Sequence, residues 1–128
     1  MKVLLDTHAF LWWIMNDPRL SERATAIIAA PENSVYMSAA SAWEIAIKAQ
    51  IGKLSLAQPV EQYIPAQVTI NGFIDLPISL GHALQTYSLP LHHRDPFDRI
   101  LVAQSQLEEM FLLSADPLLS RYAVDVIW

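Results

Sequence analysis

Five carboxylates stand where strands are expected to end or helices to begin. Asp6 directly follows the apolar run KVLL, and Glu44 lies in the stretch SAWEIA. Asp95 and Asp98 lie three residues apart in RDPFDR, and Asp116 follows FLLSA. Two carboxylates about 4 Å apart repel by on the order of 1 to 4 kcal/mol in a wet or partly wet site. A group of them therefore needs protons or bound cations.

The chemistry that such a group favours is that of a hard divalent cation. Oxygen ligands select Mg²⁺ or Mn²⁺, whereas zinc prefers histidine or cysteine, and the chain has no cysteine. A carboxylate pocket that holds one or two Mg²⁺ ions is a common device for phosphodiester hydrolysis. Aspartyl-phosphate enzymes fit less well, because they use a late lysine and Lys53 is the last one here.

The elements that must position these acids alternate between strand and helix. Short apolar runs predict strands over 2–5, 34–37, 73–78, 111–113 and 124–127. In chain order, the first expected helix ends at about residue 15, the second spans 22–30 and the third ends at about residue 52. Three further helices are expected over 60–68, over 79–87 and from about residue 96 to 110. This alternation predicts an α/β fold, a three-layer α/β/α sandwich with a mainly parallel sheet of about four to five strands. Ligands of such sheets bind beyond the carboxyl ends of the strands, where all five acids are expected.

Each acid also has a purely structural explanation. Asp95 and Asp116 each precede a proline, the arrangement of a helix N-cap with proline at the first helical position. Ser41 and Glu44 have the spacing of a capping box, and Glu44 and Lys48 form a favourable i,i+4 pair. A cap contributes roughly 1 kcal/mol, which is sufficient reason for any one acid. The recurrence of acids at one edge is what favours a reaction centre.

Composition limits the class of protein. The 128 residues are 53% hydrophobic and 16% charged, which predicts one folded domain. The N-terminal apolar stretch is interrupted by Asp6 and His8 and has no cleavage site, so we expect a cytoplasmic protein that is neither exported nor in a membrane. The net charge of −5 speaks against binding nucleic acid, unless bound dications reverse the local sign.

Four stretches, in order along the chain, resemble the PIN-domain ribonucleases, and specifically the VapC-like toxins of type II toxin–antitoxin modules. The stretches are LLDTHAFLWW at 4–13, SAASAWEIAIKAQIGKL at 38–54, LPLHHRDPFDRILVAQ at 89–104 and LLSADPLL at 112–119. The resemblance implies a single PIN-like domain over 1–128 and an endoribonuclease that depends on Mg²⁺ or Mn²⁺. It also implies a cognate antitoxin and a homodimer as partners.

The resemblance carries over to particular acids. Asp6, Glu44, Asp98 and Asp116 match the catalytic and metal-binding quartet, with Asp6 and Asp98 as the principal metal ligands. Family members vary most at the fourth acid. Asp95 is expected either to cap a helix or to reach the metal through water.

Further candidates concern substrate and partner. His93, Arg94 and Arg99 form a basic patch beside the acids that would bind RNA phosphates, and a solvated loop is the alternative. Trp12 and Trp13 lie on opposite sides of a helix, so they either pack in the core or anchor an antitoxin segment.

Two other functions are compatible with the sequence. One is a catalytically silent PIN-like module that binds a protein, with the acids as caps. The other is a housekeeping RNA-processing nuclease.

Overall fold

The centre of the fold is a parallel sheet. The computed structural model describes residues 1–92 and 94–128, and within them five strands pair in the order β3-β2-β1-β4-β5. All four pairings are parallel, with Leu5 beside Met37 on one side and Leu113 on the other. The prediction of an α/β fold with a parallel sheet between helices is confirmed. The strands are β1 (Lys2–Leu5), β2 (Ser34–Ser38), β3 (Ile74–Leu76), β4 (Phe111–Leu113) and β5 (Val126–Ile127).

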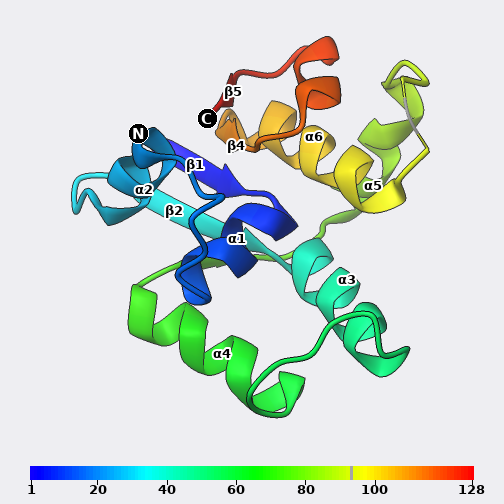
Figure 1. Ribbon diagram of the computed structural model, residues 1–128. Helices are drawn as coiled ribbons and strands as arrows, with labels where there is room; N and C mark the ends of the chain where they lie inside the picture. The colour runs from blue at the N-terminus through cyan, green and yellow to red at the C-terminus, as the bar shows by residue number, and fades with distance from the viewer. Residues whose placement is uncertain (93) are drawn as a thin grey trace.

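The connections between strands are helical, as Figure 1 shows. The expected helices all occur, with ends shifted by a few residues where no sharp capping signal marks them. Of the described residues, no helix is both long and apolar enough to cross a membrane. The helices are α1 (Thr7–Ile14), α2 (Glu22–Ala29), α3 (Ala39–Gln50), α4 (Val60–Asn71), α5 (Leu80–Gln85) and α6 (Pro96–Glu108), with the 3₁₀ segments η1 (Thr86–Ser88) and η2 (Pro117–Arg121).

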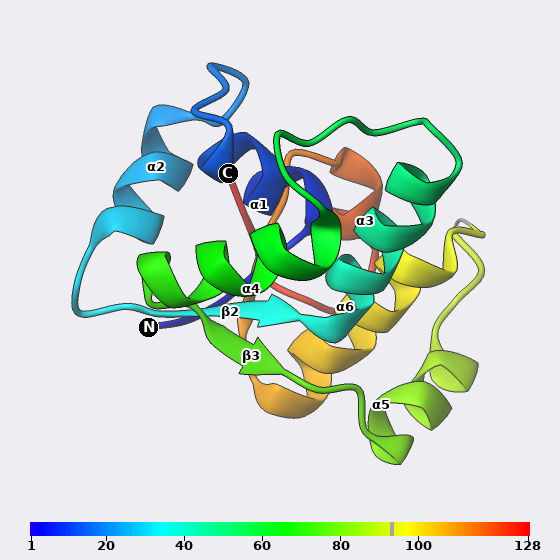
Figure 2. The ribbon, with the colours of Figure 1, turned by 90° about the horizontal axis from the view of Figure 1, so that it is seen from below.

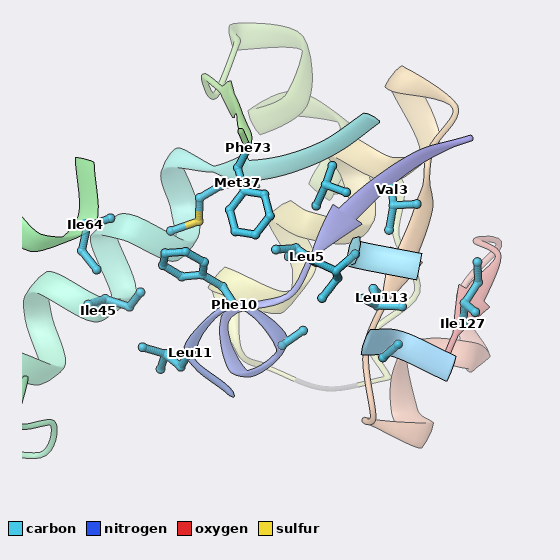
Figure 3. Packing of buried hydrophobic residues seen from close by; sticks show 14 residues of the cluster. Val3, Leu5, Phe10, Leu11, Met37, Ile45, Ile64, Phe73, Leu113 and Ile127 are labelled. Carbon is cyan, nitrogen blue, oxygen red and sulfur yellow. The ribbon is translucent and has the colours of Figure 1, made fainter. Parts of the chain in front are cut away.

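The alternation of side chains along the strands divides the core into two clusters. Val3 and Leu5 of β1 belong to the cluster that contains Phe10 of α1 (Figure 3). Leu4, between them, belongs to the cluster that contains Leu101 of α6. All five side chains are fully buried. Because successive residues of a strand face opposite sides, helices cover both faces, and Figure 2 shows α4 and α6 on opposite sides of β2.

The start of α3 differs from the prediction. The sequence suggested a capping box between Ser41 and Glu44, but the N-cap is Ser38, whose Oγ accepts a hydrogen bond from the backbone N–H of Ala40 at 3.0 Å. The chain turns directly from β2 into the helix, three residues earlier than expected. Ser41 is consequently a buried residue inside α3, and the Glu44 side chain is released for other contacts.

The start of α6 follows the prediction. Asp95 Oδ1 accepts from the backbone N–H groups of Phe97 at 2.9 Å and Asp98 at 3.3 Å, and Pro96 is the first helical residue. This cap fixes the entry of the chain into α6 and places Asp98 in its first turn.

Candidate active site at the carboxyl edge of the sheet

Neighbouring strands and helices bring the predicted acids to one edge of the sheet. Asp6 ends β1 and caps α1, with Oδ1 accepting from the backbone N–H of Ala9 at 2.7 Å. Asp116 follows β4, which pairs with β1, and caps η2 through the N–H of Leu118 at 2.9 Å. Glu44 is in α3 after β2, and Asp98 is in the first turn of α6. The N-terminal parts of α3 and α6 lie side by side in Figure 1.

The pKa of Asp98 shows that these acids share one electrostatic environment. It is raised from 3.8 to about 7. Burial is the main cause, and the negative charges of four other acids contribute: Asp95, Asp6, Glu44 and Asp116, from the largest effect to the smallest. Because the interaction between charges weakens with distance, the five carboxylates lie near one another at this edge of the sheet. We call these five residues the acidic pocket.

Asp6 is the most deeply placed of the predicted principal ligands. Burial raises its pKa, and the charge of Asp116 adds to this effect. Hydrogen bonds from the Ser114 side chain and the Ala9 backbone, together with the charge of His8, act in the opposite direction. A bound cation would favour the ionised form more strongly than these donors do.

Glu44 is held by two side chains of the protein. Thr7 Oγ1 donates to Glu44 Oε1 at 2.6 Å, and Lys48 Nζ donates to Oε2 at 2.7 Å. The Thr7 hydroxyl also lies 3.0 Å from Ser41 Oγ, which ties α1 to α3. The predicted i,i+4 pair of Glu44 and Lys48 is therefore present, and Glu44 is buried beneath it.

The donor set of the pocket fits a hard dication. It offers carboxylate oxygens, which Mg²⁺ and Mn²⁺ prefer. In the described part of the chain, however, no three acidic or histidine side chains already lie close enough to enclose an ion. Protein donors occupy Oδ1 of Asp6 and both oxygens of Glu44, and like charges disfavour a closer approach. The pocket thus has the right ligand chemistry in an open arrangement.

A groove of about 390 Å³ lies beside the pocket. Its walls include Phe97 and Arg99, which flank Asp98 in sequence, and it also contains Arg94 and Trp43. The ring of Trp43 is 61% exposed and meets Phe97 edge-on at 5.2 Å between ring centres. The spacing of apolar residues in the sequence predicts Trp43 on the apolar stripe of α3, but Trp43 is exposed at this groove.

The three predicted RNA-binding residues differ in their surroundings. Arg94 is exposed at the groove. Arg99 donates to the carbonyl oxygens of Pro90 at 2.8 Å and Thr86 at 2.9 Å, so its guanidinium holds the segment before α6 in place. His93 lies outside the described residues. The RNA contact of Arg99 remains a prediction, but its side chain already has a structural role.

The two adjacent tryptophans are both half-buried. Trp13 packs against the core cluster, and its Nε1 donates to Asn71 Oδ1 at 2.9 Å, so it joins α1 to α4. Trp12 stacks on His8 instead. The prediction that these tryptophans pack in the core therefore fits Trp13 better than Trp12.

Sequence reasoning missed Ser114, which binds Asp6. A signal was present, because Ser114 precedes Asp116 by two residues, and its Oγ accepts from the Asp116 backbone N–H at 3.0 Å. Lys48 was predicted only to stabilise the helix, but its ammonium group also pairs with Glu44 in the acidic pocket.

The fold and the candidate site define the class of this protein as an α/β protein with a parallel sheet and a group of carboxylates at its carboxyl edge. Comparison with known families gives the particular family. The profile of the PIN domain matches residues 3–125, so the chain belongs to the PIN domain family.

A relative and several solved structures support this assignment. Over 70 residues the chain is 41% identical to Ribonuclease VapC16 of Mycobacterium tuberculosis, an alignment that spans 52% of this chain and about half, 48%, of the relative. The fold is similar to VapBC2 from Rickettsia felis bound to a promoter DNA fragment, with a TM-score of 0.72, 13% identity, and 99% and 98% of the two chains covered. DNA-bound VapBC from Salmonella typhimurium gives a TM-score of 0.69, 16% identity, and coverage of 99% and 97%. The resemblance noted in the sequence is confirmed.

Proposed function

We propose that the protein is an endoribonuclease that depends on Mg²⁺ or Mn²⁺ and acts as the toxin of a toxin–antitoxin pair. The observation that carries the enzymatic part is the effect of four other carboxylates on Asp98, whose pKa is raised to about 7. Such crowding of acids is unfavourable unless it serves a cation. The name of the relative, a ribonuclease, supports RNA as the substrate.

The proposed metal site uses Asp6 and Asp98 as principal ligands, with Glu44 and Asp116 completing the set. When bound, such an ion lowers the pKa of the attacking water and stabilises charge on the leaving oxygen. Asp95 has a distinct role in this proposal: it caps α6, and its charge acts on Asp98.

The other residues of the pocket orient these acids. Thr7 and Lys48 hold the two oxygens of Glu44, and the Ala9 backbone holds Asp6. These contacts fix the carboxylates to α1 and α3 before any substrate binds, which lowers the cost of assembling the site. In this proposal Arg94, an exposed residue of the groove, binds an RNA phosphate.

The toxin role rests on likeness to proteins named as members of toxin–antitoxin complexes, including a toxin–antitoxin complex from Klebsiella pneumoniae with a TM-score of 0.65 and 18% identity. In this proposal an antitoxin covers the acidic pocket and the toxin forms a homodimer. Co-expression with the product of a small open reading frame directly upstream should yield a complex that no longer cleaves RNA.

The test of the enzymatic proposal is cleavage of total cellular RNA with Mg²⁺, followed by mapping of the new 5′ ends. We expect Asp98→Asn to slow cleavage by at least about 100-fold, because metal catalysis supplies several kcal/mol of barrier lowering. Asp125→Asn is the matched control, since Asp125 is an exposed acid that precedes β5 and so lies at the opposite edge of the sheet. It should cleave as the wild type does.

Equal cleavage by wild type and Asp98→Asn would show that the site is wrong. A wild type that neither cleaves RNA nor responds to Mg²⁺ would instead favour a catalytically silent PIN-like binding module. A wild type that cleaves a single precursor RNA and has no inhibitory partner would favour a housekeeping nuclease.

A further inference from the structure

A row of stacked side chains runs along α1 and ends beside the acidic pocket. The rings of His8 and Trp12 are stacked, with centres 5.5 Å apart and planes inclined by 24°. The guanidinium of Arg19 lies over the Trp12 ring, 5.0 Å from its centre. Trp128 meets Trp12 edge-on at 5.7 Å. We call His8, Trp12 and Arg19 the stacked row.

The far end of the row is anchored. Arg19 Nε and Nη2 donate to the two carboxylate oxygens of Asp17 at 3.1 and 2.8 Å. This two-pronged pair fixes the plane of the guanidinium against Trp12, and Trp12 is half-buried. The orientation of the His8 ring, at the other end of the row, is therefore determined by Trp12 and by the Arg19–Asp17 pair that supports Trp12.

The near end of the row is open. His8 is an exposed residue, although its ring stacks on Trp12. His8 is two residues from Asp6, and its charge acts on the Asp6 carboxylate. A flat, rigidly supported ring therefore lies open beside an acid of the proposed catalytic site.

We propose that His8 is a stacking platform for an unpaired base of the RNA, next to the phosphodiester that is cleaved. Single-stranded RNA is recognised largely by stacking of splayed bases on aromatic side chains. The row supplies such a surface in advance, so little side-chain entropy is lost on binding. A net charge of −5 leaves little general attraction for RNA, which makes a base contact more valuable here.

This inference rests on the proposed ribonuclease function for its position relative to the cut, but its test does not. Binding is measured by fluorescence anisotropy with two labelled strands, the RNA A12 and a 12-residue abasic ribose-phosphate strand. All proteins carry Asp98→Asn, which is expected to slow cleavage during the measurement. We expect His8→Ala to weaken A12 binding about tenfold and to leave the abasic strand unaffected, because only the A12 strand has bases that stack on the ring.

Two variants separate stacking from other effects. His8→Tyr keeps a stacking ring without an imidazole charge and should retain A12 affinity within about twofold. Tyr87→Ala removes a ring that is 94% exposed in η1, away from α1, and should bind as the parent does. A His8→Ala variant that retains Asp98 should keep the Mg²⁺-dependent rise in thermal midpoint, because this rise reports on the acidic pocket.

Several outcomes would overturn the platform while leaving the nuclease intact. These are unchanged A12 affinity in His8→Ala, equal losses in His8→Ala and Tyr87→Ala, or no rescue by His8→Tyr. Unchanged RNA affinity with loss of binding to the inhibitory protein would assign His8 to a protein interface and also overturn the proposal. Conversely, base-dependent binding through His8 in a wild type that cleaves no RNA would keep the platform and reject the nuclease.

Discussion

Two clusters of polar side chains differ in how their charges are arranged. One is the acidic pocket. The other, which we call the glutamine cluster, consists of Ser38, His82, Gln104 and Glu108. Ser38 Oγ donates to Gln104 Oε1 at 2.6 Å, and the His82 ring bridges the Ser79 backbone N–H, at 3.0 Å, and Glu108 Oε1, at 3.2 Å.

In the glutamine cluster each donor meets an acceptor. His82 Nδ1 accepts from Ser79, so Nε2 carries the proton and donates to Glu108. Gln104 is fully buried, and its amide nitrogen lies 3.3 Å from the carbonyl of Pro77. In the acidic pocket the carboxylates repel one another, and this repulsion contributes to the raised pKa of Asp98. The glutamine cluster stabilises the fold, whereas the mutually repelling carboxylates favour binding of a cation.

The largest stability effect is expected in the glutamine cluster. Gln104→Leu removes the acceptor of Ser38 and the donor to Pro77 inside the core, so the free energy of unfolding should fall by about 2 kcal/mol. Urea unfolding measures this. Gln106→Leu makes the same change at a half-buried position of α6 and should cost at most about 0.5 kcal/mol. Similar costs for both variants would mean that the cluster is not a stabilising unit.

The acidic pocket should respond to pH in the opposite sense from an ordinary carboxylate. The pKa of Asp98 is 3.8 ordinarily and about 7 in the fold. Between these values the folded state keeps a proton that the unfolded chain has released. Without metal, the protonated Asp98 carboxyl therefore contributes stability to the folded state. This contribution is fully present below about pH 4 and is lost as pH rises through 7.

The size of this pH effect is reduced by solvent at the half-exposed carboxyl, and on the order of 1 kcal/mol is expected between pH 5 and 8. Urea unfolding in EDTA across this range should show the decline in wild type and a smaller decline in Asp98→Asn, where Asp6 keeps its raised pKa. A wild-type free energy of unfolding that increases over this range would contradict the account.

The smallest effect concerns the ion pair of Lys48 and Glu44. The Lys48 side chain is 39% exposed, so Lys48→Met should change the metal-free free energy of unfolding by less than about 1 kcal/mol. Its loss leaves Glu44 without its ammonium partner, so the apparent Mg²⁺ affinity should rise a few-fold. Lys53→Met, which removes an exposed lysine beyond α3, is the control. A weaker Mg²⁺ response in Lys48→Met would mean that the lysine organises the site instead of competing with the ion.

Much of this arrangement follows from sequence pattern. Lys2–Leu5 is an apolar run that is followed by a polar residue, and Asp95-Pro96 is a strong helix start. The bounds of β1 and the start of α6 could therefore be predicted accurately from the sequence. Parallel strands place their carboxyl ends together, which is why the grouping of Asp6, Asp98 and Asp116 could be anticipated.

Other features depend on tertiary contacts that no local pattern encodes. Ser38 and Ser41 are equally good capping residues, and only the path of the chain from β2 decides between them. The guanidinium of Arg99 binds carbonyl groups of a segment whose path is set elsewhere in the fold. The hydrogen bond from Thr7 to Glu44 joins residues 37 positions apart.

The most direct test of the central claim is the thermal midpoint as a function of Mg²⁺ concentration in wild type, Asp98→Asn and Asp125→Asn. A ligand at 100 times its Kd stabilises the folded state by about 2.7 kcal/mol. We expect the midpoint to rise with Mg²⁺ in wild type and Asp125→Asn and to stay constant in Asp98→Asn. A midpoint that does not move in wild type, or that rises equally in all three, would contradict it.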